Sequence, residues 1–331
     1  MNIIHCRCCL TLLLLPALLS AQEPEVAALL PPTSVATAKT ETASNLRALI
    51  VCGLLGDAER RKLYAETVER LYLGLTTHHG FKPENVVLLW SDKLPEDAGP
   101  ALNTSRGPAT RDALSTTVAE IESILLPSDA LWVFVLGHSH FDGRHSWLNL
   151  PGPDLQHVEF GKMFSNIQCR EQVFFMTGSV SGFHLKSLAA ANRIVITSTE
   201  ADLEVNETLF PHHLAKALAE PPAFRELDID EDGRLSLLDV YLLTCREVAA
   251  EYAAGMNLAT EHALLDDTGD GRGSEVQVDY LTEELGGRWR TGRPKPVRRV
   301  GDGALARRML LDHPPSPPSP DDGGGSDANI K

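Results

Sequence analysis

Five short apolar runs, separated by longer amphipathic stretches, constrain the fold more than any other feature of the chain. The runs are Arg47 to Gly53, Asn85 to Trp90, Ala130 to Leu136, residues 172–177 and residues 193–198. Continuous apolar runs of this length predict strands that are buried on both faces. Apolar residues recur at helical spacing in residues 57–78 and 110–125, which predicts amphipathic helices. Strands alternating with helices predict an α/β fold, a three-layer sandwich around a mostly parallel sheet.

The pattern changes beyond residue 205, where the chain is predicted to be mainly helical. We expect an α/β domain over 46–220 and a helical C-terminal part over 221–285. A basic segment over 286–312 could dock on an anionic surface or serve as a solvated linker, and its last residues could form a short helix. The Pro- and Gly-rich tail, 313–331, is predicted to be disordered.

The N-terminus has the layout of a secretory signal peptide. An arginine precedes an apolar run from Leu10 to Leu19, and Ala21 supplies a small residue before the polar residues that follow. We therefore expect residues 1–21 to be removed and 22–45 to form a flexible lead-in. The alternative is an uncleaved N-terminal anchor. The run is shorter than the ~20 residues that span a bilayer, so we expect an exported protein (secreted, periplasmic or at the cell surface) with no stable membrane span after cleavage.

Cysteine content and charge narrow the classes of protein to which the chain can belong. Removal of residues 1–21 would leave Cys52, Cys169 and Cys245, an odd number that cannot form a complete disulfide framework. The chain has 30 basic and 45 acidic residues, a formal charge of −15. Such a chain repels phosphate backbones, so nucleic acid is not an expected partner.

Two polar residues directly follow predicted strands. His138 follows the run 130–136, and Ser179 follows the run 172–177. The carboxyl ends of parallel strands gather at one edge of a sheet, so these two residues could form a nucleophile and base pair. Nearby His140 and His145 could bind a metal or could be ordinary loop residues.

Several segments resemble the caspase-like clan, and most of all its legumain-type branch. They are R-A-L-I-V-C-G-L-L-G-D from Arg47, A-E-T-V-E-R-L-Y-L-G-L from Ala65, F-V-L-G-H-S-H-F-D-G from Phe134, T-G-S-V-S-G from Thr177, and N-R-I-V-I-T-S-T-E-A-D from Asn192. The resemblance covers roughly residues 46–265 and implies a caspase-like three-layer sandwich. It aligns His138 with the family's catalytic His and Ser179 with its Cys nucleophile.

This chain departs from the family pattern at both catalytic positions. Ser179 stands where the family has Cys, and Ser139 replaces the second Gly of the G-H-G turn. A serine hydroxyl is far less acidic than a thiol, so a site arranged for a thiolate loses most of its activity. We therefore expect a degenerate site and a binding or scaffold role toward a protein or peptide. The alternative is a peptidase that uses a Ser179–His138 dyad.

Residues 228–239, D-I-D-E-D-G-R-L-S-L-L-D, match the EF-hand calcium loop. The residues at the ligand positions are Asp228, Asp230, Asp232, Arg234, Ser236 and Asp239. Arg234 would contribute only its backbone carbonyl, and Gly233 takes the sharp turn at position six. The loop predicts calcium as cofactor. Because it is single and ends in Asp instead of Glu, we expect weak binding and a structural role, in the simplest case only stiffening the fold.

A second acidic turn, D-D-T-G-D-G-R-G-S, spans residues 266–274. Counted from Asp266, it has Asp270 at position five and Gly271 at position six, but Gln277 stands at position twelve, where calcium loops carry an acid. The sequence leaves two interpretations open, a cation site or a Gly-rich turn.

Overall fold

The structure is a computed structural model that describes residues 45–201, 203–281, 285 and 300–311. The expected signal peptide, almost all of the lead-in, most of the basic segment and the C-terminal tail lie outside the described residues. The described residues all belong to one compact unit, Thr42–Lys331.

A six-stranded sheet with the order β2-β1-β3-β7-β8-β9 forms the centre of this unit. Its strands are β1 (Leu46–Cys52), β2 (Val86–Trp90), β3 (Ala130–Leu136), β7 (Glu171–Met176), β8 (Arg193–Thr197) and β9 (Leu264–Asp266). All neighbouring strands pair in parallel except β9, which runs antiparallel to β8. The five strands predicted from the apolar runs are confirmed to within one or two residues at each end.

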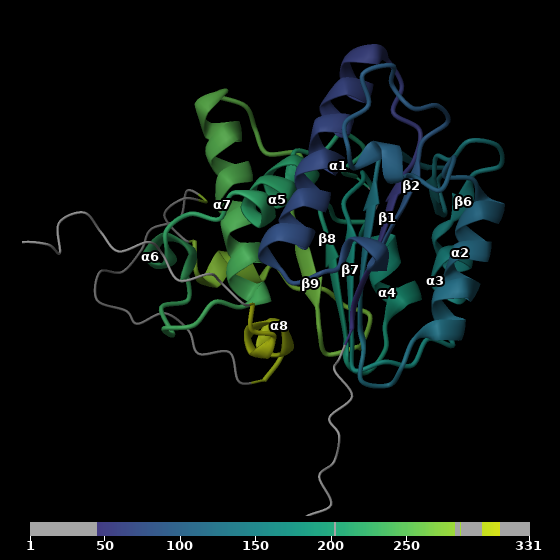
Figure 1. Ribbon diagram of the computed structural model, residues 1–331. Coiled ribbons are helices and arrows are strands. Elements are labelled where there is room, and N and C mark those ends of the chain that lie inside the picture. Colours follow the sequence, from purple (N-terminus) through teal and green to yellow (C-terminus); the bar gives the residue numbers. More distant parts are fainter. Residues whose placement is uncertain (1–44, 202, 282–284, 286–299, 312–331) are drawn as a thin grey trace, which may run out of the picture. The chain divides into compact units, whose positions relative to one another are not determined.

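Helices cover both faces of this sheet (Figure 1). The helices are α1 (Ala58–His78), α2 (Arg111–Ile124), α3 (His157–Met163), α4 (Phe183–Leu188), α5 (Phe210–Ala219), α6 (Phe224–Leu227), α7 (Leu237–Ala254) and α8 (Ala304–Arg308), with 3₁₀ turns η1 (Pro83–Asn85), η2 (Leu102–Thr104) and η3 (Val276–Asp279). One core packs the sheet against α1, α5 and α7, and a second core packs its other face against α2, α3 and α4.

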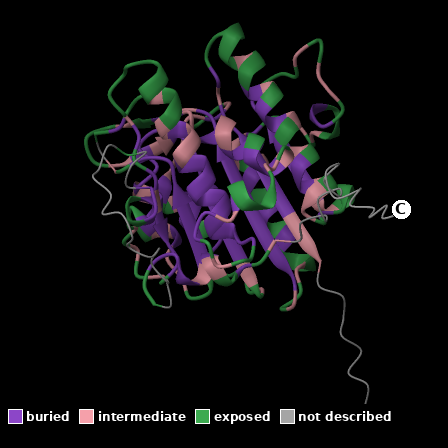
Figure 2. Cartoon of the chain, turned by 90° about the vertical axis from the view of Figure 1, so that its left-hand side faces the viewer, coloured by how far each residue is buried: buried purple, intermediate pink, exposed green. Residues whose placement is uncertain are grey.

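Alternation along the strands builds both cores at once. In β1, Ile50 points into the core under α1, whereas its neighbour Val51 points into the core under α2. All residues of β3 are buried, and the interior of the sheet is almost entirely buried in Figure 2. This is the predicted three-layer α/β sandwich with a mostly parallel sheet.

Two parts of the sheet structure are not visible in the sequence pattern. A small antiparallel sheet, β4 (Ser139–Phe141), β5 (Ser146–Leu148) and β6 (Leu155–Gln156), follows β3 directly. Strands of two or three residues are too short to show a periodicity. β9 belongs to the part expected to be helical, and the core under α1 continues without a break from α5 into α7.

The described helices include none long and apolar enough to cross a membrane. The three described cysteines are free thiols, and Cys52 and Cys245 are buried.

Candidate functional site

His138 and Ser179 lie at the same edge of the sheet because their strands are neighbours. β3 and β7 pair in parallel, with Val135 opposite Met176, so both residues come shortly after the carboxyl ends of adjacent strands. The sequence predicted that both residues lie at this edge, and the structure brings the two turns together there.

The Ser179 hydroxyl is bound by the main chain. Its Oγ donates to the carbonyl of Ser139 at 2.8 Å, and the residue is buried. The next residue, Val180, has φ of 45° and donates its N–H to the carbonyl of Glu204 at 3.0 Å. In the part of the chain that the structure describes, no hydrogen bond joins Ser179 to His138.

The ring of His138 faces a carboxylate that the sequence analysis did not single out. Its Nε2 lies 3.9 Å from Oε1 of Glu207, and the side chain is about a quarter exposed, at 27 %. Glu207 is in turn held by Arg60, whose Nε donates to Oε2 at 2.6 Å. Glu207 sits in a loop after β8, far along the chain from His138, so no local pattern could have identified it.

The three described cysteines are poor candidates for a nucleophile. Burial raises the pKa of the Cys52 and Cys245 thiols far above their usual range, and it raises the pKa of Cys169 to about 11. A thiol with a raised pKa stays protonated at neutral pH and is a poor nucleophile.

Three carboxylates of the predicted calcium loop converge. One ligand oxygen from each of Asp228, Asp230 and Asp232 lies within 4.8 Å of the others. The amide of Gly233, at φ of 80°, donates to Oδ2 of Asp228 at 3.1 Å. The amide of Arg234 donates to Oδ1 of Asp232 at 2.9 Å. These bonds hold the backbone of the loop close to Asp228 and Asp232, its first and fifth positions.

The last two side chains of the predicted ligand set start the helix that follows. Ser236 is the N-cap of α7 and forms a capping box with Asp239. Oδ1 of Asp239 accepts from the amide of Ile229 at 2.9 Å, which ties the helix start to the loop start. Burial raises the pKa of Asp239 to about 6. Asp239 is not one of the carboxylates that converge.

Arg307 places a positive charge against this loop. Its guanidinium lies 2.7 Å from Oδ2 of Asp230 and 2.6 Å from Oδ2 of Asp232. The surrounding segment is fixed by main-chain bonds from Leu237 N to Met309 O and from Leu311 N to Leu235 O, both at 2.9 Å. Arg307 is distant in sequence from the loop, so the sequence alone could not show this contact.

The other histidines near β3 have local partners. Asp142 accepts hydrogen bonds from the amides of Arg144 and His145 and from Nε1 of Trp147. His140 shares a hydrogen bond of 2.6 Å with Oδ1 of Asn149. Among the described residues this cluster does not form a group able to hold a metal.

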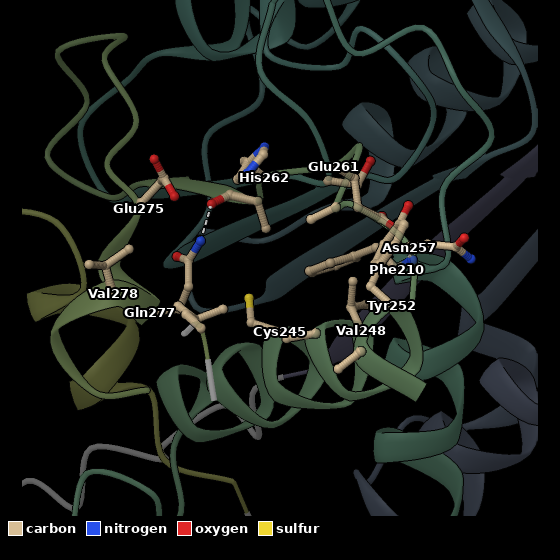
Figure 3. Close-up of a pocket in the computed structure, with 16 residues that line it drawn as sticks. Phe210, Cys245, Val248, Tyr252, Asn257, Glu261, His262, Glu275, Gln277 and Val278 are labelled. Carbon is tan, nitrogen blue, oxygen red and sulfur yellow. Dashed lines mark hydrogen bonds between the residues drawn. The ribbon is translucent and has the colours of Figure 1, made fainter. Parts of the chain in front are cut away.

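A separate cavity of about 430 Å³ lies beside α7 and is drawn in Figure 3. Apolar side chains such as Val248 and Phe210 form much of its wall. Burial raises the pKa of Glu261 in this wall to about 7. The side-chain amide of Gln277 donates to the carbonyl of Ala263 at 2.9 Å, the dashed line in Figure 3. Neither His138 nor Ser179 lines the cavity.

No protein-family model matches the chain, and no curated protein matches it. Among solved structures, it is similar to the Drosophila initiator caspase Dronc, with 11 % sequence identity and a TM-score of 0.39 over 69 % of this chain and 81 % of that chain.

Proposed function

We propose that this chain is an exported, calcium-binding protein whose α/β domain has lost the catalytic use of its strand-end residues. The observation that carries the proposal is the convergence of Asp228, Asp230 and Asp232 within 4.8 Å. Such hard oxygen ligands suit Ca²⁺, which takes six to eight oxygens in flexible geometry.

The Arg307 contact shows that the loop carboxylates attract a positive charge, and it bears on the calcium affinity of the loop. The loop carboxylates already hold a positive group at 2.6 and 2.7 Å. A calcium ion must compete with that guanidinium. In addition, Asp239, the acid at position twelve, is engaged in the capping box at the start of α7. Both features favour an affinity of ~10⁻⁴–10⁻³ M, the range of extracellular modules.

The geometry around Ser179 supports a binding role over hydrolysis. A serine nucleophile needs a base that accepts its proton and donors that stabilise the oxyanion. The Ser179 hydroxyl donates to the Ser139 carbonyl, whereas His138 faces Glu207. The rival function, hydrolysis by a Ser179–His138 dyad, has the shared sheet edge in its favour. We propose that a protein or peptide is the partner of the degenerate domain.

The test is the response of thermal stability to calcium. At 10 mM calcium, a site of the expected affinity stabilises the folded state by about 1–3 kcal/mol, or ~2–4 °C per kcal/mol for a chain of this size. We expect Asp228→Asn with Asp230→Asn to lower the calcium-induced rise in Tm by about that amount.

A matched control carries the same two charge changes at exposed positions, Asp97→Asn with Asp112→Asn. It should respond to calcium like the unchanged protein. If the loop variant and the control respond equally, the loop does not bind calcium.

A further inference from the structure

The cavity beside α7 lies on the side of the sheet that α1, α5 and α7 cover. Its wall residues Phe210, Cys245 and Val248 belong to the core on that side. In Figure 3, the side chains of Cys245 and Val248 rise from α7 on one side of the space, and Glu261 and His262 lie on the other. The volume of about 430 Å³ is within the range of small-molecule sites, ~300–1,000 Å³. Because much of the wall is apolar, a ligand that fills this space has an apolar body.

Glu261, which lines the cavity, has a carboxyl group with no cation beside it. The residue is 6 % exposed. Its Oε1 accepts from the amide of Leu209 at 2.8 Å, and its Oε2 accepts from the amide of Phe210 at 3.2 Å. Among the described residues, no Lys, Arg or His side chain forms an ion pair with Glu261. Burial raises its pKa, against the two amide bonds that lower it. A carboxylate oxygen has two lone pairs, so Glu261 can accept a further hydrogen bond from a ligand.

The other charged groups in the wall leave the cavity negative. His262 is paired with Glu204, so its positive charge is already matched. Glu275 is exposed and adds a second acid to the lining. None of the described residues that line the cavity is Lys or Arg. A ligand whose charge complements this wall is therefore a cation.

We propose that this cavity binds a small organic cation, an amine with an apolar body, whose ammonium group is held by Glu261. The apolar body would contact Phe210 and Val248, and the ammonium group would donate to the carboxylate. A positive group offsets the cost of burying a carboxylate, which a neutral or anionic molecule of the same size does not do. This site rests on the cavity and its charges, and it does not depend on calcium binding.

The experiment measures the binding of 2-phenylethylamine to the full chain by ligand-observed NMR titration, in EDTA so that calcium is absent. At pH 8 the amine is a cation, and Glu261, with a pKa of about 7, is mostly ionised. The matched probes are N-acetyl-2-phenylethylamine, which is neutral, and 3-phenylpropionate, which is an anion. We expect the amine to bind with a Kd of roughly 1 mM and the other two to bind at least about tenfold more weakly.

Two pairs of variants locate the binding. Ala249 lines the cavity, whereas Ala250, the next residue of α7, is exposed and does not. Ala249→Phe should therefore abolish binding of the amine, and Ala250→Phe should leave its Kd unchanged. Glu275 is exposed, so Glu275→Gln should fold and should raise the Kd about two- to fivefold. Glu122, exposed on α2 across the sheet, provides the control Glu122→Gln, which should have no effect.

Three results would each overturn the site. They are no binding of the amine at about 10 mM, equal Kd values for the three probes, and equal Kd values in Ala249→Phe and Ala250→Phe when both are folded. If Ala249→Phe does not fold, the comparison of Glu275→Gln with Glu122→Gln decides, and equal Kd values in that pair would overturn the site.

Discussion

At the scale of single residues, Ser179 follows the end of β7, and its side chain is bound by the main chain. Its hydroxyl satisfies the carbonyl of Ser139 at 2.8 Å. The sequence identified the position, but the direction of the hydroxyl depends on how the turn after β7 meets β4, a strand too short to predict. The same holds for Glu207, which faces His138 through tertiary structure alone.

This role gives a prediction for Ser179→Ala. The substitution leaves a buried carbonyl without its donor, so the free energy of unfolding should fall by about 1–2 kcal/mol, measured by urea denaturation. A fluorophosphonate probe should label neither protein. Labelling of the unchanged protein that is lost in Ser179→Ala would instead support the hydrolase.

Glu261 should give the protein a measurable pH dependence. Burial raises its pKa from 4.5 to about 7, so between these values the folded state holds more protons than the unfolded state. Stability should therefore fall as pH rises from about 5 to 7, by up to ~1.4 kcal/mol per pH unit, and then level off.

The comparison with Glu261→Gln isolates this group. Other groups, such as Asp239 and His262, also titrate with raised pKa values, but they are common to both proteins. In urea denaturation at pH 5, 6, 7 and 8, the stability of the unchanged protein should fall relative to that of Glu261→Gln as the pH rises. Parallel curves would mean that Glu261 is ionised throughout.

At the scale of elements, the long buried strands were predictable and the short ones were not. β1 and β3 are continuous apolar runs because both of their faces are covered by helices. β9 has three residues and joins the sheet only because α7 returns the chain to β8. The acidic loop was predictable for a different reason, since its pattern is local and dense.

The short helix α8 connects the two acidic turns, and this could not be predicted from the sequence. Asp302 lies just before it and accepts a hydrogen bond from Ser274 of the second turn, whereas Arg307 lies near its end and contacts the first loop. Each contact joins residues far apart in the chain. The surroundings of both turns are thus set by tertiary structure.

Arg307→Gln tests the competition between this guanidinium and calcium. Removing the positive charge should raise the calcium affinity of the first loop by about fivefold, from an ion-pair free energy of about 1 kcal/mol. It should also lower Tm in EDTA, because Asp230 and Asp232 then lose their partner. Isothermal titration with calcium measures the affinity.

The neighbouring Arg308 is exposed and provides a matched control. Arg308→Gln carries the same charge change and should alter neither quantity. Equal affinities in the two variants would show that Arg307 does not oppose calcium binding.

At the scale of the whole molecule, the acidic charge suits the calcium binding that we propose. A formal charge of −15 raises the local concentration of cations near the surface. The sheet predicted from the sequence positions His138 and Ser179 at its strand ends, and the second acidic turn begins at the end of β9. The 228–239 loop instead lies between α6 and α7.

The most direct test of the central claim is a calcium titration of the full chain by calorimetry, compared with Asp228→Asn and Asp230→Asn combined. We predict that the unchanged protein binds calcium at ~10⁻⁴–10⁻³ M and that the variant binds one equivalent fewer. The same number of equivalents in both proteins would contradict the assignment of this loop as a calcium site.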